Sequence, residues 1–225
     1  MSDYGAIFPQ WREAAGPEWT RYTRHAFVEG MRDGSLPRAA FLHYLVQDYI
    51  FLIHFSRAWA LAVTKAETVE EMRLCAATVN ALINEEIALH VRTCAEAGLS
   101  EDALQGAEEA AGNLAYTRYV LDAGHSGDLL DLLAALAPCV LGYGEIGARL
   151  GAEASSDTYR DWIDTYAGAD YQGVCTDVAA LIDAVAARTL GDDPQASPRW
   201  PALCRRFATA TRLEVGFWDM GLRPA

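Results

Sequence analysis

Residues 37–65 read PRAAFLHYLVQDYIFLIHFSRAWALAVTK and carry the strongest structural signal in the sequence. Proline stands only at the first position, where its fixed backbone angle favours the start of a helix, and the segment is apolar nearly all round. A long helix without a polar face is typical of the interior of a helical bundle. We therefore predict a central helix over this segment.

The same helical signal recurs along the rest of the chain. Alanine, leucine, glutamate and arginine dominate, runs of β-branched residues are absent, and glycine or proline recurs at helix-length intervals. Thr68 with Glu71 forms a capping box, and Asn113 is the expected cap of a later helix. No composition shift marks a boundary, so residues 1–225 are expected to form a single all-α domain, a multi-helix bundle. Besides 37–65, the predicted segments are 17–30, 68–98, a short one from 100, 113–124, 128–151, 156–168, 170–191 and a last helix between the 192–198 loop and residue 221.

Composition and charge narrow the classes of function. The chain has 225 residues, of which 52% are apolar and 22% charged, and this excludes an intrinsically disordered protein. Its 18 basic and 31 acidic residues give a net charge of −13. Because such a surface repels phosphate backbones and anionic lipids, we expect neither nucleic acids nor membranes as partners. A small neutral or cationic ligand suits this charge better.

Cysteine usage and the apolar segments favour a cytoplasmic protein. The five cysteines include no C-x-x-C pair, which indicates free thiols in a reducing compartment. The first residues show no signal peptide. The apolar segment 41–63 contains Gln47, Asp48, His54 and Arg57, which a bilayer would disfavour. We therefore expect a soluble cytoplasmic protein.

Two carboxylates interrupt apolar helix faces. Asp48 falls in the middle of the apolar face of the 37–65 helix, and Glu214 falls between Ala210 and Phe217 on that of the last helix. Burial raises the pKa of a carboxyl toward values useful for acid–base chemistry, and two such groups indicate a polar pocket inside the bundle. The structural alternatives are an Asp48 bond to arginine or tyrosine, and a Glu214 that pairs with arginine or reaches water.

A proline inside the 128–151 helix marks a third unusual place. Pro138 removes a backbone hydrogen bond and is expected to kink the helix. Cys139 and Tyr143 are four residues apart and share a face, and the glycines at 142, 144 and 147 allow another group to approach the backbone closely. Cys139 is therefore a candidate nucleophile, with inert packing as the alternative.

Other motifs lack the context that they need. Residues 142–147 match G-x-G-x-x-G, but no strand precedes them, so we reject dinucleotide binding. Glu86 and His90 have a spacing that could hold a metal ion, although a surface or structural hydrogen-bonding role for His90 is the simpler interpretation. His25 alone is a weak signal for haem ligation. The paired Glu-x-x-His of di-iron bundles is absent from the sequence.

Six short segments contain these residues and follow one another along the chain. They are Gln47-Asp48-Tyr49, Asn84-Glu85-Glu86 with Leu89-His90, Ala115-Tyr116, Pro138-Cys139 with Tyr143, Trp162-Ile163-Asp164-Thr165-Tyr166, and Glu214 with Phe217-Trp218-Asp219-Met220. Together they resemble the TenA family, also called thiaminase II, over residues 10–220. The Pro-Cys-x-x-x-Tyr and Glu-x-x-Phe-Trp-Asp-Met segments are the most specific parts of the resemblance.

The resemblance implies a haem-oxygenase-like bundle, usually a homotetramer, that needs no cofactor or metal. The family deaminates 4-amino-5-aminomethyl-2-methylpyrimidine (below, the aminomethylpyrimidine) to the hydroxymethylpyrimidine, or cleaves thiamin. By motif, Cys139 is the nucleophile that adds to the pyrimidine ring, and Glu214 is the acid–base group at a ring nitrogen. Asp48 matches the carboxylate that holds the exocyclic amine. The residues that match the lining of the substrate pocket are Phe51, Tyr116, Tyr143, Tyr166 and Phe217.

Phe51 departs from the family pattern, because many members have tyrosine there. The loss of that hydroxyl could alter rate or substrate choice. Since the chain shows no basic or glycine-rich cradle for a diphosphate, we expect the aminomethylpyrimidine to be the best substrate, thiamin a slower one and thiamin diphosphate a poor one. Two alternatives remain: an oxygenase of the haem-oxygenase or pyrroloquinoline-quinone synthase type, and a non-catalytic pyrimidine-binding regulator.

Overall fold

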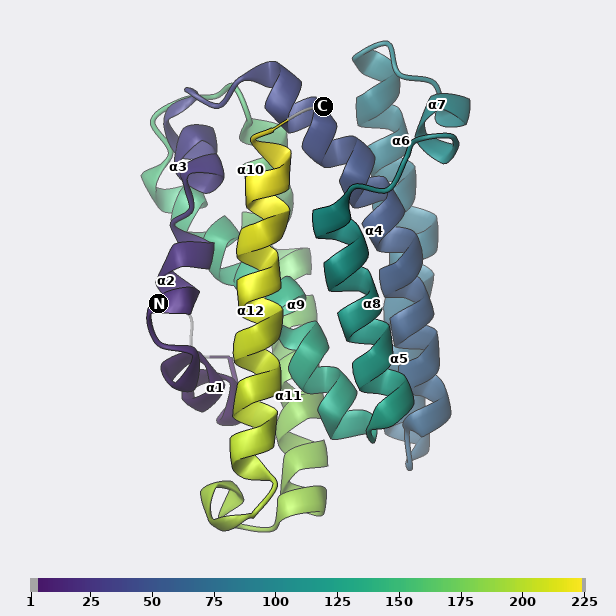
Figure 1. The fold of residues 1–225 in the computed structure, drawn as a ribbon, viewed down its shortest axis with the longest axis vertical. Helices are drawn as coiled ribbons and strands as arrows, with labels where there is room; N and C mark the ends of the chain where they lie inside the picture. The colour runs from purple at the N-terminus through teal and green to yellow at the C-terminus, as the bar shows by residue number, and fades with distance from the viewer. Residues whose placement is uncertain (1–3, 224–225) are drawn as a thin grey trace.

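The computed structural model describes residues 4–223, and the regular structure of this part of the chain is entirely helical (Figure 1). The prediction of an all-α multi-helix bundle is confirmed. The elements are α1 (Ile7–Ala15), α2 (Pro17–Thr23), α3 (Ala26–Asp33), α4 (Arg38–Lys65), α5 (Val69–Ala81), the π-helical turn η1 (Leu82–Glu86), α6 (Ile87–Glu96), α7 (Glu101–Gln105), α8 (Ala111–Ser126), α9 (Leu129–Glu153), α10 (Arg160–Ala167), α11 (Ala169–Leu190), the 3-10 turn η2 (Pro194–Ala196) and α12 (Trp200–Gly221).

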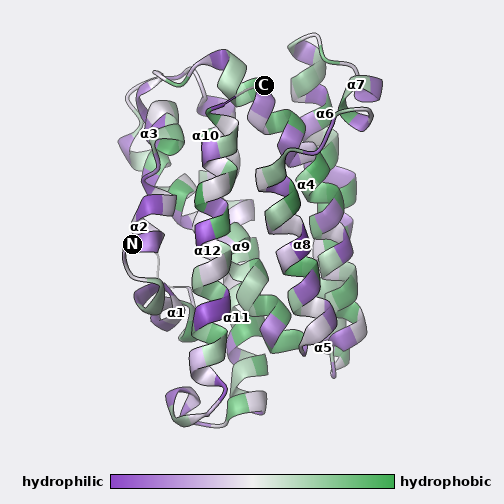
Figure 2. Cartoon of the chain, viewed as in Figure 1, coloured by the Kyte–Doolittle hydropathy of each residue, from purple (hydrophilic) through white to green (hydrophobic). Residues whose placement is uncertain are grey.

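The long helices run along the long axis of the molecule, and α9 lies among them. Helix α9 packs against α8, α10, α11 and α12, while α1 and α2 lie along α12 on the other side (Figure 1). In Figure 2 the hydrophobic colour of α9 contrasts with the mixed colouring of α12 and α8 in front of it. Helix α9 is long and apolar enough to cross a membrane, but 83% of its most apolar window is buried inside the bundle. It is therefore a core helix.

The glycines of α9 let neighbouring helices approach its backbone. A Cβ atom at position 142 would overlap the ring of Tyr22 from α2, and one at position 144 would overlap the sulfur of Cys175 from α11. At position 147 a Cβ atom would overlap the backbone of Tyr166 from α10. The close approach predicted from these glycines is thus made by three other helices.

Several local predictions were accurate and others were wrong. The predicted central helix, the Thr68–Glu71 capping box and the Ser100 start of a short helix are confirmed. The predicted 17–30 helix is instead two helices, because His25 leaves the helical conformation and its Nδ1 accepts from the backbone of Phe27 at 3.2 Å. Asn113 does not cap a helix; it lies buried within α8, where its side-chain amide donates to a backbone carbonyl of α4.

The predicted 68–98 helix is interrupted by the π-helical turn η1. A π turn places one extra residue in a helix and changes which side chains face inward. Such turns are frequent at functional sites. Here the turn ends at Glu86, and α6 then carries His90 into the bundle.

Candidate active site

Asp48 and Glu214 both lie inside the bundle, as their places on apolar helix faces predicted. Asp48 of α4 is 4% exposed and Glu214 of α12 is 1% exposed. Burying an ionised carboxylate is costly unless it gains partners or takes up a proton. The two side chains avoid this energetic cost in different ways.

Glu214 is held as a carboxylic acid. Its Oε1 accepts a hydrogen bond of 2.9 Å from the hydroxyl of Tyr116 on α8. Burial, assisted by the nearby charge of Asp48, raises the pKa of Glu214 to about 8 in spite of the Tyr116 hydrogen bond. The alternative of an arginine pair or a solvated edge position is therefore wrong, and Glu214 carries a proton at neutral pH.

Asp48 is paired with a buried histidine. Its Oδ2 lies 2.6 Å from Nε2 of His90 and 3.2 Å from the hydroxyl of Tyr44, one turn earlier in α4. The other ring nitrogen, Nδ1 of His90, lies 3.0 Å from the backbone oxygen of Glu86. Burial disfavours a charged ring, but the hydrogen bond and charge of Asp48, with Glu86, outweigh it and raise the pKa of His90 to about 9. His90 and Asp48 thus form a buried ion pair.

Glu86 adds a third acid beside this ion pair. Its Oε1 accepts a hydrogen bond of 3.2 Å from the hydroxyl of Tyr166 on α10. Burial raises the pKa of Glu86 to about 7, although the charge of His90 opposes this. The side chain keeps some accessible surface because it borders two cavities.

These two cavities lead into the bundle from its surface. The smaller, of about 200 Å³, is also lined by His90 and Trp162, and the larger, of about 750 Å³, reaches α9 at Val140. Glu86 and Tyr166 border both of them. Cys139, the residue before Val140, and Glu214 line neither of these two cavities.

The thiol of Cys139 is partly buried and lies near two acidic side chains. It is half-buried, whereas Cys75, Cys94 and Cys175 are fully buried. Burial raises the pKa of Cys139 well above its usual range, and Glu214 is the largest contributor among its charged neighbours, ahead of Asp48. The thiol is therefore protonated at rest.

Side chains of other helices bond to the carbonyl groups around Pro138. The hydroxyl of Tyr22 donates to the oxygen of Pro138 at 3.1 Å, and that of Tyr171 donates to the oxygen of Val140 at 3.3 Å. Helix α9 continues through the proline from residue 129 to residue 153. The turn that carries Cys139 is thus fixed from α2 and α11.

The predicted lining residues form two aromatic groups. In the first group, the ring centroid of Phe51 lies 5.2 Å from that of Tyr116 and 5.4 Å from that of Phe217. In the second group, the ring centroid of Tyr143 lies 5.1 Å from that of Tyr166. Tyr44 approaches Phe217 to 6.1 Å and donates to Asp48, so it links the first group to the ion pair. The structure thus brings the two acids and the predicted aromatic residues into one region.

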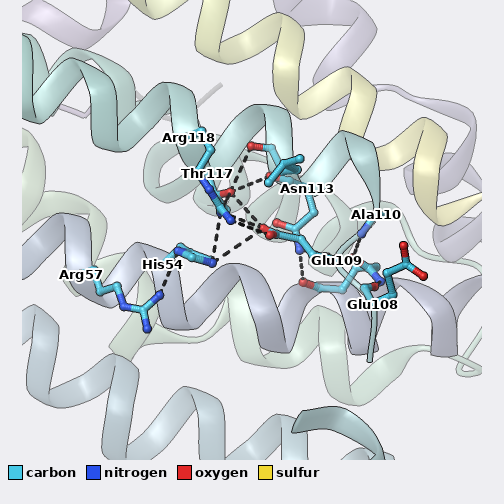
Figure 3. Close-up of polar contacts among 10 residues, drawn as sticks. His54, Arg57, Glu108, Glu109, Ala110, Asn113, Thr117 and Arg118 are labelled. Atoms are coloured by element: carbon cyan, nitrogen blue, oxygen red, sulfur yellow. Dashed lines mark hydrogen bonds and ion pairs between the residues drawn. The ribbon is translucent and has the colours of Figure 1, made fainter. Parts of the chain in front are cut away.

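A polar cluster between α4 and α8 positions α8. The side chain of Gln47 accepts from the backbone of Ala110 at 2.9 Å and donates to that of Glu108 at 2.9 Å, which fixes the start of α8. Beyond it, Arg118 bridges His54 and Glu109 (Figure 3). Gln47, the neighbour of Asp48 in sequence, thus fixes the helix that carries Tyr116.

A known protein family matches almost the whole chain. The model of the TENA/THI-4/PQQC family matches residues 12–224. The chain belongs to this family. The resemblance inferred from the six segments is confirmed.

Relatives of this TenA-family chain include an aminopyrimidine aminohydrolase from Halalkalibacterium halodurans, which is 36% identical over 211 residues, or 92% of each chain. An uncharacterised protein from Haemophilus influenzae is 38% identical over 213 residues, or 93% of this chain and 96% of the relative. A crystal structure from Silicibacter sp. TM1040, described as a TenA family transcription regulator, is 62% identical, covers 98% of each chain and has a TM-score of 0.97. A TenA homologue from Pyrococcus horikoshii is 25% identical, with a TM-score of 0.86 and coverage of 97% and 99%.

Three residues of this region, Tyr44, Glu86 and His90, were not among the predicted site residues. Glu86 and His90 were part of the family resemblance and were also considered as a metal pair, with a surface or hydrogen-bonding role for His90 as the simpler interpretation; His90 is hydrogen-bonded and buried, so the surface position is wrong. Both ring nitrogens of His90 hold hydrogen bonds, and the described residues contain no cluster of three or more side chains suited to a metal ion. The useful signals were spacings of four residues: Tyr44 to Asp48, and Glu86 to His90.

Proposed function

We propose that this protein is a hydrolase of thiamin salvage that converts the aminomethylpyrimidine to the hydroxymethylpyrimidine and releases ammonia, with slower cleavage of thiamin. The observation that carries the proposal is a half-buried thiol in one region with a buried, protonated carboxyl and two groups of aromatic rings. The names of relatives from Halalkalibacterium halodurans, Helicobacter pylori and Bacillus subtilis, all aminopyrimidine aminohydrolases, support the same reaction.

The first step is the addition of a thiol across a ring bond. Glu214, protonated at neutral pH, donates its proton to a ring nitrogen while the sulfur of Cys139 bonds to the adjacent ring carbon. The thiol proton then replaces the one that Glu214 has lost. No net charge is created in the buried pocket, which suits a thiol and a carboxyl whose pKa values are both raised.

The second step exchanges the leaving group for water. The electron pair of the ring nitrogen returns through the ring and expels ammonia, or the thiazole of thiamin, from the exocyclic carbon. Water adds to the resulting methylene group, and the Cys139 sulfur departs and restores the aromatic ring. The sum is one water consumed, one C–N bond broken and one C–O bond formed.

Asp48 and the aromatic residues hold the substrate during these steps. The Oδ2 atom of Asp48 is occupied by Tyr44 and His90, which leaves Oδ1 to accept from the exocyclic amine of the pyrimidine. The rings of Tyr116 and Phe217 on one side and of Tyr143 and Tyr166 on the other supply apolar faces for a planar heterocycle.

A regulatory function is the second candidate, because the 62% identical crystal structure is described as a transcription regulator. The net charge of −13 disfavours direct binding to DNA. A regulator of this kind would bind the pyrimidine without turning it over.

Product release by the purified protein tests the proposal: ammonia is measured for the aminomethylpyrimidine, and the thiazole product is measured for thiamin and thiamin diphosphate. We expect kcat/KM to fall in the order aminomethylpyrimidine, thiamin, thiamin diphosphate, measured on one preparation at one pH. Turnover of thiamin tenfold better than that of the aminomethylpyrimidine would make the protein a thiamin-cleaving enzyme instead. Tight binding of the pyrimidine without ammonia release would favour the regulator.

A further inference from the structure

His90 has an unusual set of contacts for a buried histidine. It is 5% exposed, and both of its ring nitrogens face acceptors: Nε2 faces the carboxylate of Asp48 at 2.6 Å and Nδ1 faces the backbone oxygen of Glu86 at 3.0 Å. A neutral imidazole has only one N–H group and cannot donate to both. This geometry therefore favours the imidazolium form, with one proton on each nitrogen.

The position of His90 determines which oxygen of Asp48 can accept a hydrogen bond from a ligand. The imidazolium and Tyr44 both bind Oδ2, so the carboxylate cannot rotate freely and its other oxygen is left for an incoming donor. The backbone oxygen of Glu86, at the end of the π-helical turn, holds the ring in place from the opposite side. Asp48 is thus oriented through His90.

We propose that His90 is a positioning residue: it holds Asp48 as an oriented carboxylate whose free oxygen selects ligands with an exocyclic amine. The inference rests on the proposed function for the identity of the ligand, but it concerns binding and does not require turnover. His90 touches no reacting atom in this account and acts only through Asp48.

The charged and titratable groups around His90 set the pH range for a test. Helix α4 supplies Asp48 and Tyr44, and the π-helical turn supplies Glu86. From α10 Tyr166 faces the same pocket through Glu86. The small cavity beside His90 is also bordered by Arg38, Glu96, Asp157, Arg160 and Asp161. Of the groups in contact with His90, the Glu86 carboxyl titrates within the range used below, so each variant is compared with wild type at the same pH.

The direct test is the binding of the hydroxymethylpyrimidine by His90→Gln, measured by calorimetry. Glutamine can still donate a hydrogen bond but carries no charge, so the buried carboxylate of Asp48 loses its cation and is held less firmly. We expect Kd to rise at least tenfold at pH 7. His125→Gln, the same change in an exposed histidine in the last turn of α8, should leave Kd within twofold of wild type.

A second ligand and a second variant test whether His90 positions Asp48 or only stabilises the structure in general. The 4-oxo analogue, which lacks the exocyclic amine, should bind wild type and His90→Gln equally. The double variant Asp48→Asn/His90→Gln should bind the hydroxymethylpyrimidine no more weakly than Asp48→Asn alone, because His90 acts only through Asp48. Additive losses, or equal losses for both ligands, would overturn the proposal.

Nitrogen NMR of the wild-type protein keeps the proposal testable even if His90→Gln does not fold. Both ring nitrogens of His90 should show protonated shifts from pH 6 to pH 8. A neutral ring over that range would contradict the ion pair. Because these measurements need no turnover, a protein that binds the pyrimidine without releasing ammonia would fail the proposed function and still decide the role of His90.

Discussion

At the scale of single residues, the two buried carboxyl groups of this region have different partners. Glu214 accepts from the phenol of Tyr116 and burial raises its pKa to about 8, whereas Asp48 faces His90, whose pKa is raised to about 9. A proton donor and an amine acceptor are the two roles that an aminopyrimidine requires. The same region of the protein interior therefore offers a candidate for each role.

The raised pKa of Glu214 makes a prediction about stability. A carboxyl with an unfolded-state pKa near 4.5 and a folded-state value of about 8 stabilises the fold fully below pH 4.5, and this contribution is lost as pH rises through 8. Glutamine does not titrate. We expect Glu214→Gln to gain stability relative to wild type between pH 5 and pH 9, measured by urea unfolding.

A substitution at the surface is the control for the stability change of Glu214→Gln. Glu13→Gln, at an exposed position of α1, should show no such trend with pH. If Glu214→Gln and wild type keep a constant difference in unfolding free energy across the range, Glu214 is ionised in the folded protein and cannot be the proton donor.

At the scale of elements, the close approach of α10 to α9 positions Tyr166. The backbone of Tyr166 lies against Gly147, where no Cβ atom fits. We expect Gly147→Ala to destabilise the protein by about 1–3 kcal/mol, because the two helices must move apart. KM should also rise, since Tyr166 moves with α10.

Gly173 on α11 is the matched control for this substitution. It lies within a helix and has open space where a Cβ atom would stand. Gly173→Ala should therefore stabilise the protein by about 0.5–1 kcal/mol through helix propensity alone. A neutral or stabilising Gly147→Ala would show that the α9–α10 contact is not tight.

Site residues could be predicted from the sequence where the pattern of a single helix face identified them. They could not be predicted where the site depends on a contact between two helices. Asp48 and Glu214 were identified because each interrupts an apolar face of its own helix, and their burial is confirmed. His90 was not recognised as a partner of Asp48, because the contact joins residues 42 positions apart and depends on the π-helical turn before α6. Helical periodicity describes neither a π turn nor a crossing between helices.

At the scale of the whole molecule, the net charge of −13 should influence the binding of charged substrates. The screening length falls from roughly 30 Å at 0.01 M salt to about 8 Å at 0.15 M. We expect KM for the cationic aminomethylpyrimidine to rise severalfold over this range. The inhibition constant of the neutral hydroxymethylpyrimidine, measured in the same assay, should stay constant; equal changes for both compounds would exclude electrostatic attraction.

Cys139 carries the covalent step of the proposed mechanism, and the ammonia released by Cys139→Ala tests that step most directly. The variant should fold normally and lose at least three orders of magnitude in kcat on the aminomethylpyrimidine, because no covalent bond to the ring can form. Cys204→Ala, a half-exposed thiol on α12, should retain full activity. If Cys139→Ala releases ammonia at near the wild-type rate, the mechanism proposed for this site is wrong.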